Sequence, residues 1–305
     1  MSARRWRKLG RIYDAAPLHE KLVSHAANPL PVHLSGDVFR IFFSGRDKES
    51  RSSVGFADID IATGSVLGVS EKPAFQHGPS GSFYSHGVSI GNCYRSRDGH
   101  IMLFMGWRIP DREHWRGEIG SLKVGTDLSL SLHGDSPLIG LSPQDPVSLS
   151  YPWVFGEEGG GFCMWYGSTV AWDAGNGEML HVIKHARSSD GRHWELDGKG
   201  VPYEIGVAQA FSRPTVARSD DGWHMWFSFR SGRGLPYRIG YAHSHDGAAW
   251  ELRLDEAGID VSSSGWDSEM IEYPFVFEHR DALYMLYNGN GYGKTGFGLA
   301  IAETV

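Results

Sequence analysis

The chain has 305 residues and a formal net charge of −7, which provides no general attraction to nucleic acid or to an anionic membrane surface. Its 40 glycines and 12% aromatic residues are typical of many short strands joined by tight turns. Two cysteines, Cys93 and Cys163, make no disulfide framework, and no apolar run reaches membrane-span length, so we expect a cytoplasmic protein.

One pattern recurs five times along the chain: a polar turn, an aromatic-rich strand and then a small or polar residue. One core position of this pattern recurs at spacings of 61, 62, 61 and 60 residues, and it holds Phe43, Phe104, Tyr166, Phe227 and Tyr287. A fixed period of this length indicates a repeat architecture.

Each repeat is predicted to contain four short antiparallel strands. The strands before the aromatic ones begin near Pro29, Val88, Pro152, Pro214 and Pro274. A strand tolerates proline as its first residue, and pairs such as Asp98-Gly99 supply hairpin turns. A third strand follows the aromatic strand, and a fourth is clear at 188–196 and 244–252. Four such strands make a propeller blade.

The sequence therefore predicts an all-β fold, a five-bladed β-propeller that forms a single domain over residues 1–305. The blades are expected at about 28–75, 86–140, 151–203, 213–260, and 273–305 with 5–10. The last repeat ends without a fourth strand, and the segment that begins at Trp6 resembles the fourth-strand segments at Trp194 and Trp250. We expect the N-terminal strand to complete the last blade, which closes the ring and removes an open edge.

Several motifs that resemble chemical sites are better explained as structure. The Asp-Gly pairs fit turns, and the recurring tryptophans fit packing between sheets. None of the 15 histidines forms a cluster with metal-ligand spacing, because His181 and His185 lie four apart in a strand. The glycine-rich segment 288–296 lies in a hairpin and lacks the helix of a phosphate loop. We therefore expect no metal and no cofactor.

The candidate site is the mouth of the central channel, where the innermost strands of all blades begin. The residues at these strand starts include Asn28, His86, Tyr151, Arg213, Glu272 and Tyr273. The neighbouring loops add Arg46, Asp47, Trp107, Asp145, Trp172, Arg230, Glu269, Asn288 and Asn290. Aromatic rings beside bidentate hydrogen-bonding groups are typical of sugar or anion recognition. We expect a small-molecule sugar or sugar-phosphate ligand and no nucleic-acid or membrane partner.

Five segments carry a family resemblance that spans the chain: SHAANPLPVHL, RIFFSGRD, SSVGFADIDI, GWDSEMIEYPFVF and YNGNGYGKTGFGLA. The chain resembles the five-bladed propellers related to glycoside hydrolase families 43, 32 and 130. It is most similar to "glucosyl hydrolase-like" proteins of bacterial sugar and surface-polysaccharide gene sets. The resemblance implies sugar chemistry at the channel mouth. Family 43 enzymes have three catalytic carboxylates, whereas the matching positions here hold Asn28, Ser85-His86 and Ser150-Tyr151.

These features favour a carbohydrate-active, glycoside hydrolase-like enzyme that acts on a glycosidic or sugar–phosphate bond. Hydrolysis uses two carboxylates, so the candidates are Glu272 or Glu269 with Asp145 or Asp47. Glu272 is predicted to be the acid because it is the only carboxylate at a strand start. An ion pair with Arg213 is the structural alternative for this residue.

Other functions stay open at this point. A phosphorolytic enzyme needs one acid and an anion site, for which Arg213, His86, Arg46 and Arg230 are candidates. A non-hydrolytic lyase, isomerase or transferase could act on a sugar-like or nucleotide-sugar metabolite. The protein could also be an inactive sugar-binding propeller. The oligomeric state is open.

Overall fold

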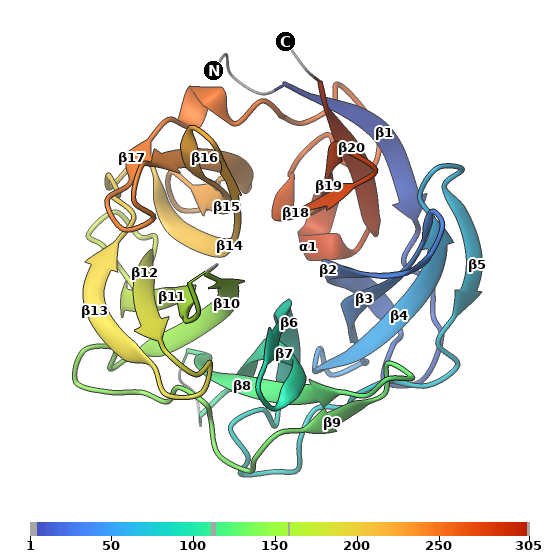
Figure 1. Cartoon of the computed structure of the whole chain (residues 1–305), viewed down its shortest axis with the longest axis horizontal. Coiled ribbons are helices and arrows are strands. Elements are labelled where there is room, and N and C mark those ends of the chain that lie inside the picture. Colours follow the sequence, from blue (N-terminus) through green and yellow to red (C-terminus); the bar gives the residue numbers. More distant parts are fainter. Residues whose placement is uncertain (1–4, 111–113, 158, 304–305) are drawn as a thin grey trace.

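A computed structural model describes residues 5–110, 114–157 and 159–303 of the chain. Almost all regular structure in these residues is β-strand. The helices are a single 3-10 turn, η1 (Leu254–Glu256), and the short α1 (Asn290–Gly293). No helix in this part of the chain is long and apolar enough to cross a membrane. The sheets are set around a common centre (Figure 1).

The strands form antiparallel groups of four that mostly follow chain order. The first group holds β2 (Ser24–Ser35), β3 (Val38–Arg46), β4 (Ser52–Asp60) and β5 (Ser65–Val69). The second holds β6 (Gly87–Ser96), β7 (Gly99–Arg108), β8 (Arg116–Val124) and β9 (Leu130–Leu132). A single parallel bridge from Ser52 to Gly87 joins these two groups into one sheet.

Three further sheets complete the molecule. One holds β10 (Ser148–Gly156), β11 (Phe162–Ala171), β12 (Leu180–Ser188) and β13 (Glu195–Gly200). The next holds β14 (Gln209–Ser219), β15 (Gly222–Arg230), β16 (Arg238–Ser244) and β17 (Glu251–Leu252). The last combines β18 (Glu272–His279), β19 (Ala282–Asn288) and β20 (Phe297–Glu303) with β1 (Arg5–Tyr13).

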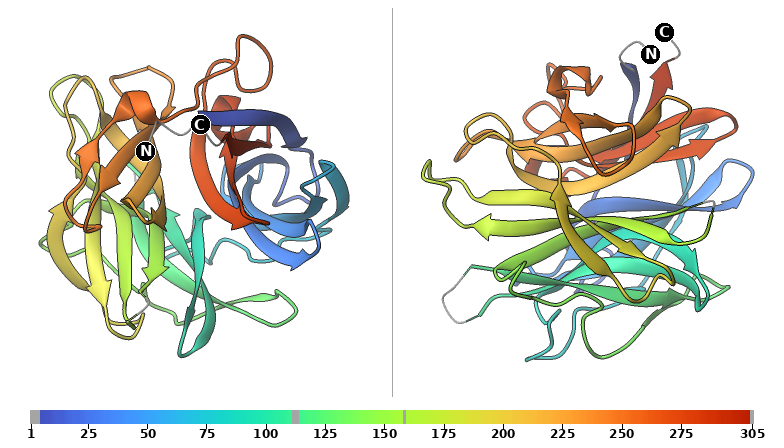
Figure 2. Two further views of the ribbon diagram at one scale, coloured as in Figure 1. Left: turned by 45° about the horizontal axis from the view of Figure 1, so that its top comes forward. Right: turned by 60° about the vertical axis from the view of Figure 1, so that its left-hand side comes forward.

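The predicted pairing of the N-terminal strand with the last strand is confirmed. β1 runs antiparallel to β20 from the Arg5–Glu303 pair to the Tyr13–Phe297 pair, and the two strands lie side by side in Figure 2. Trp6 is buried, and its ring meets that of Trp226 edge-on at 5.5 Å. This contact attaches the N-terminal strand to the neighbouring sheet as well as to its own.

The first strands of the groups surround the centre of the molecule. β2 contacts β6, β6 contacts β10, β10 contacts β14, β14 contacts β18, and β18 contacts β2 again. Between the sheets lie the aromatic residues of the repeat. The five that recur at the aligned core position are all buried. A Cβ atom at Gly120 would lie 2.3 Å from the Phe104 ring, so the glycine of the third strand makes room for that ring.

Four of the inner strands share a bulge where the chain enters the centre. The residue before the proline has a positive φ in each: 56° at Asn28, 34° at Tyr151, 46° at Arg213 and 53° at Tyr273. The strand register shifts at each of these places. A non-glycine residue in this region is strained by about 1–3 kcal/mol and typically occurs near a functional site. A bulge also redirects a side chain, here at the centre of the ring.

Candidate active site

A pocket of about 370 Å³ opens where the inner strands begin, and residues from every strand group line it. Its aromatic wall consists of Trp107, Trp115, Tyr151, Phe211, Tyr237, Tyr273 and Tyr292. Polar side chains also line it, among them Asn28, Arg46, Ser150, His181, Ser212 and Arg230. Thus six of the residues predicted from the sequence come together here: Asn28, Arg46, Trp107, Tyr151, Arg230 and Tyr273.

Glu272 lies beside this pocket in an unusual environment for a carboxyl group. Its side chain is fully buried, and neither carboxyl oxygen has a hydrogen-bond partner. Burial raises the pKa of Glu272 well above its ordinary value, and the nearby Arg46 and Arg230 oppose that shift. Because burial is the larger effect, it favours the neutral carboxyl group, which is the form that has a proton to donate.

Other buried polar atoms near Glu272 also lack partners. They are Oδ1 of Asn28, Oγ of Ser212 and Nε of Arg230. Asn28 and Ser212 come from β2 and β14, the two inner strands that contact β18. Buried polar groups in folded proteins nearly always have a hydrogen-bond partner, in the protein or in water. A group of unpaired atoms around one pocket is therefore suited to bind a polar ligand.

Arg213 does not present its guanidinium group to the mouth as the sequence suggested. It is 2% exposed, and its Nη atoms donate to the carbonyl oxygens of Tyr273 at 3.0 Å and Pro29 at 2.8 Å. It thereby ties β14 to β18 and β2. Burial lowers the pKa of Arg213 to about 9. The alternative of an ion pair between Arg213 and Glu272 is also absent, since both oxygens of Glu272 are unpaired.

Asp47 and Asp145 lie outside the pocket lining and already have full sets of partners. Asp47 accepts hydrogen bonds from the amides of Glu49 and Arg51 and from the Arg51 guanidinium, all within one turn. Asp145 is buried and accepts from Tyr166 at 3.0 Å and Lys184 at 2.6 Å. These contacts give both carboxylates a structural role, whereas the carboxyl oxygens of Glu272 have no partners.

Three further predicted residues organise the loop around α1. Glu269 is exposed, and its amide donates to Oδ1 of Asn290 at 2.9 Å. Asn290 also donates to the carbonyl of Gly265. Asn288 is buried; its Oδ1 accepts from the amide of Asn28 and its Nδ2 donates to Ala26. None of these three side chains lines the pocket.

His86 and Trp172 lie one layer behind the pocket wall. His86 is half-buried beside Trp107, with 6.0 Å between ring centroids. His86 directly precedes β6, and the residue of β6 that lines the pocket is Ser89. Trp172 meets Trp115 edge-on at 5.0 Å and so supports the aromatic wall from outside.

One hydrogen-bonded group was not among the predicted site residues. Oγ of Ser150 lies 2.6 Å from Nε2 of His181, whose Nδ1 lies 2.7 Å from Oγ1 of Thr169. Burial lowers the pKa of His181 to about 3, so the ring is neutral and orients the serine hydroxyl without acting as an acid. Sequence spacing does not reveal this group, since the register of β11 and β12 places Thr169 opposite His181.

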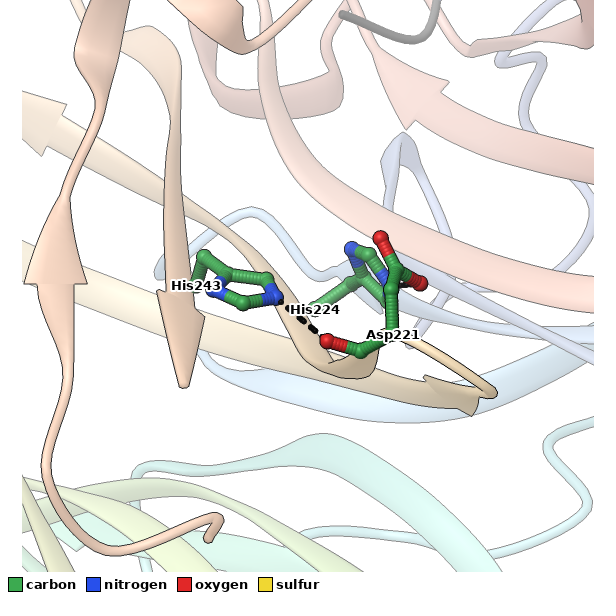
Figure 3. Close-up of side chains that lie close together, drawn as sticks. All are labelled: Asp221, His224 and His243. Carbon is green, nitrogen blue, oxygen red and sulfur yellow. Dashed lines mark hydrogen bonds and ion pairs between the residues drawn. The ribbon is translucent and has the colours of Figure 1, made fainter. Parts of the chain in front are cut away.

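A cluster with metal-ligand chemistry lies elsewhere, at the β14–β15 turn and on β15 and β16. Ligand atoms of Asp221, His224 and His243 lie within 4.8 Å of one another (Figure 3). However, Nε2 of His243 lies 3.0 Å from the carbonyl oxygen of Asp221, which can only accept, so this nitrogen carries the hydrogen. The cluster is at the end of β15 opposite the pocket-lining Arg230, and we assign it no part in the site.

Comparison with known proteins places the chain among relatives from mycobacteria. No protein-family model matches it. Two proteins of Mycobacterium tuberculosis, uncharacterized protein MT1551 of strain CDC 1551 and uncharacterized protein Rv1502 of strain H37Rv, are each 43% identical over 300 residues. The match covers 98% of this chain and 99% of each relative. The chain belongs to the Rv1502 family.

Solved structures show which known fold this chain resembles. A glycoside hydrolase matches 98% of the chain with a TM-score of 0.72 and 13% identity, and the match covers 93% of that protein. A glycosyl hydrolase from Bacteroides ovatus matches with a TM-score of 0.68, and a structure described under the family 130 of mannoside phosphorylases with 0.67. These two matches cover 92% and 94% of the matched proteins, each at 13% identity. At this identity the likeness shows a glycoside hydrolase-like fold.

Proposed function

We propose that this member of the Rv1502 family is a closed five-bladed β-propeller that cleaves a glycosidic or sugar–phosphate bond in its central pocket. The circular series of contacts among β2, β6, β10, β14 and β18 supports the propeller, as does the pairing of β1 with β20. The glycoside hydrolase-like fold supports sugar chemistry by analogy alone. The residues of the site must therefore carry the functional part of the proposal.

The observation that carries it is the buried, unpaired carboxyl group of Glu272 beside an aromatic pocket. A neutral carboxyl group in such a place can donate its proton to a leaving oxygen. Tyr151 and Tyr273, whose ring centroids are 5.4 Å apart, provide flat apolar surface against which a sugar ring can pack. Oδ1 of Asn28 and Oγ of Ser212 would bind sugar hydroxyls.

One observation favours non-hydrolytic chemistry as a second candidate. No aspartate or glutamate is among the described residues that line the pocket, and Asp47 and Asp145 have structural partners. Ordinary hydrolysis requires a second carboxylate to activate water or attack the sugar. Phosphorolysis, in which phosphate attacks the sugar and Glu272 protonates the leaving oxygen, needs no second carboxylate and fits this set of residues.

The acid is tested by Glu272→Gln, which keeps the shape of the side chain and removes the proton. We expect turnover of alkyl glycosides, whose leaving oxygen needs a proton, with water or with phosphate, and of sugar 1-phosphates to fall by about 10²-fold or more in the variant. Glu278→Gln changes an exposed carboxylate on the same strand, so its turnover should match the parent. Parental turnover by a folded Glu272→Gln protein would contradict the proposal.

A further inference from the structure

Among the residues that the structure describes, the pocket has more guanidinium groups than carboxylates to balance them. We propose that the substrate carries an anionic group, a phosphate ester or a carboxylate, which binds between Arg46 and Arg230. This inference rests on the proposed sugar chemistry and defines the class of sugar. Three observations support it: the residues that line the pocket, their unpaired hydrogen-bond donors and the charges around them.

Three arginines lie at or beneath the pocket, and they face too few carboxylates. Arg46 and Arg230 line it, and Arg213 is buried below with only carbonyl oxygens as partners. Glu178 pairs with Arg230 at 2.7 Å. Glu272 is the carboxyl group that Arg46 and Arg230 both affect, so these two carboxyl groups face three guanidinium groups even if Glu272 ionises. A buried cation without a counter-charge is costly, and a bound anion would supply that charge.

Arg46 is the arginine best placed to receive the anion. It ends β3 at the pocket, and its guanidinium has no hydrogen bond or ion pair to any of the described residues. Positive charge is concentrated around it, because Arg46 and Lys294 both add to the effect of burial in lowering the pKa of His25 to about 4. An unpaired guanidinium in a partly desolvated pocket binds carboxylate or phosphate through two parallel hydrogen bonds.

Arg230, the last residue of β15, supplies the second contact to the anion. Its guanidinium lies 4.7 Å from the centre of the Tyr237 ring, and Nη2 is held by Glu178. Its buried Nε has no partner and remains free to donate. Both arginines lie close enough to Glu272 to affect its protonation. An anion that neutralises them would leave Glu272 protonated, which keeps the acid ready in the bound complex.

The experiment measures ligand-induced stabilisation of the full chain at constant ionic strength. The probes are inorganic phosphate, glucose 1-phosphate, glucuronate and glucose. A ligand that binds the folded state raises Tm by mass action, so we expect larger shifts from the charged probes than from glucose. The two charged sugars separate the sources of the anion: a larger shift with glucose 1-phosphate indicates a phosphate ester, and a larger shift with glucuronate a carboxylate.

Arg46→Gln is the decisive variant because the Arg46 guanidinium has no partner among the described residues, so its loss should not affect folding. We expect it to bind the charged probes roughly tenfold to a hundredfold more weakly. Arg233→Gln, an exposed arginine outside the pocket lining, is the matched control and should bind as the parent does. Equal binding by Arg46→Gln and the parent, or no response to any charged probe, would overturn the inference.

The two proposals fail in different ways. If Glu272→Gln lowers turnover but Arg46→Gln leaves anion binding unchanged, the enzyme stands and its substrate is not defined by this anion site. If Arg46→Gln abolishes anion binding but Glu272→Gln turns over normally, the anion site stands and Glu272 is not the acid.

Discussion

Glu272 and Asp145 illustrate at the residue scale why burial by itself does not make a carboxyl group reactive. Asp145 is buried, and two hydroxyl groups and the Lys184 amine satisfy it. The same arrangement recurs in the last sheet, where Asp267 accepts from Tyr287 at 3.0 Å and Lys8 at 2.7 Å. Glu272 has no such partners. Hydrogen-bond donors stabilise the ionised form of a carboxyl group, and Glu272 lacks them, so its burial favours the neutral form.

The raised pKa of Glu272 predicts a pH-dependent stability. Above about pH 4.5 the unfolded chain loses this proton while the folded protein keeps it, so the stability from the neutral group falls as the pH rises toward the folded pKa. Glu272→Gln cannot lose this proton. Its free energy of unfolding should therefore increase relative to the parent by up to about 1.4 kcal/mol per pH unit over that range.

Urea denaturation between about pH 5 and pH 8 measures this difference. Glu278 is exposed on the same strand, so Glu278→Gln should differ from the parent by a nearly constant amount. A constant difference for Glu272→Gln as well would show that its carboxyl group ionises normally in the folded protein.

At the scale of elements, the inner strands position the site and β1 holds the last sheet to its neighbour. Each bulge places a strained residue at the centre, and Arg213 then secures two neighbouring strands through their carbonyl groups. β1 covers the edge of β20 that would otherwise be open. The N-terminal strand thus contributes to the stability of a site that it does not touch.

Trp6→Ala tests the contribution of β1. Trp6 is 4% exposed and packs against Trp226, so its truncation should lower the free energy of unfolding by about 3–5 kcal/mol. Leu9 lies on the same strand and is 40% exposed, so Leu9→Ala should cost no more than about 0.5 kcal/mol. Thermal or urea denaturation compares the two, and similar small losses would contradict the packing role of β1.

At the scale of the whole molecule, the place where the chain is interrupted within the repeat determines which strand comes first, but not how the strands pair. The break between β20 and β1 occupies the same place in its group as the β4–β5 turn does in the first. Arg5 and Glu303 are direct partners across the first break. The β4–β5 turn contains exposed residues at 62 and 63. We therefore expect the protein to fold with its termini either between β20 and β1 or in the β4–β5 turn.

A circular permutant tests this equivalence. Joining the natural ends through a short glycine linker and opening the chain before Thr63 would make β5 the N-terminal strand, in the role that β1 has in the natural chain. We expect a soluble, folded protein whose Tm response to glucose 1-phosphate equals that of the parent. An insoluble product, or a folded one without that response, would show that the natural position of the termini is required.

Much of the architecture followed from local patterns in the sequence. The spacing of the core position from Phe43 to Tyr287 predicted the strand groups, because every group buries its central aromatic strand in the same way. The segment that begins at Trp6 predicted the pairing of β1 with β20, because it repeats a fourth-strand pattern. The strand-start residues also predicted several pocket residues, including Asn28, Tyr151 and Tyr273.

Only the tertiary structure decided which of those residues are available to a ligand. Arg213 and Arg46 are both candidates in the sequence. Arg213 donates to two carbonyl groups, whereas the Arg46 guanidinium has no partner in the part of the chain that the structure describes. Asp145 and Glu272 are likewise separated by their surroundings alone. The physical reason is that hydrophobic periodicity sets where a strand lies and which face is buried. The direction of a side chain at a bulge, and the partners that it meets there, depend on residues from other sheets far away in the chain.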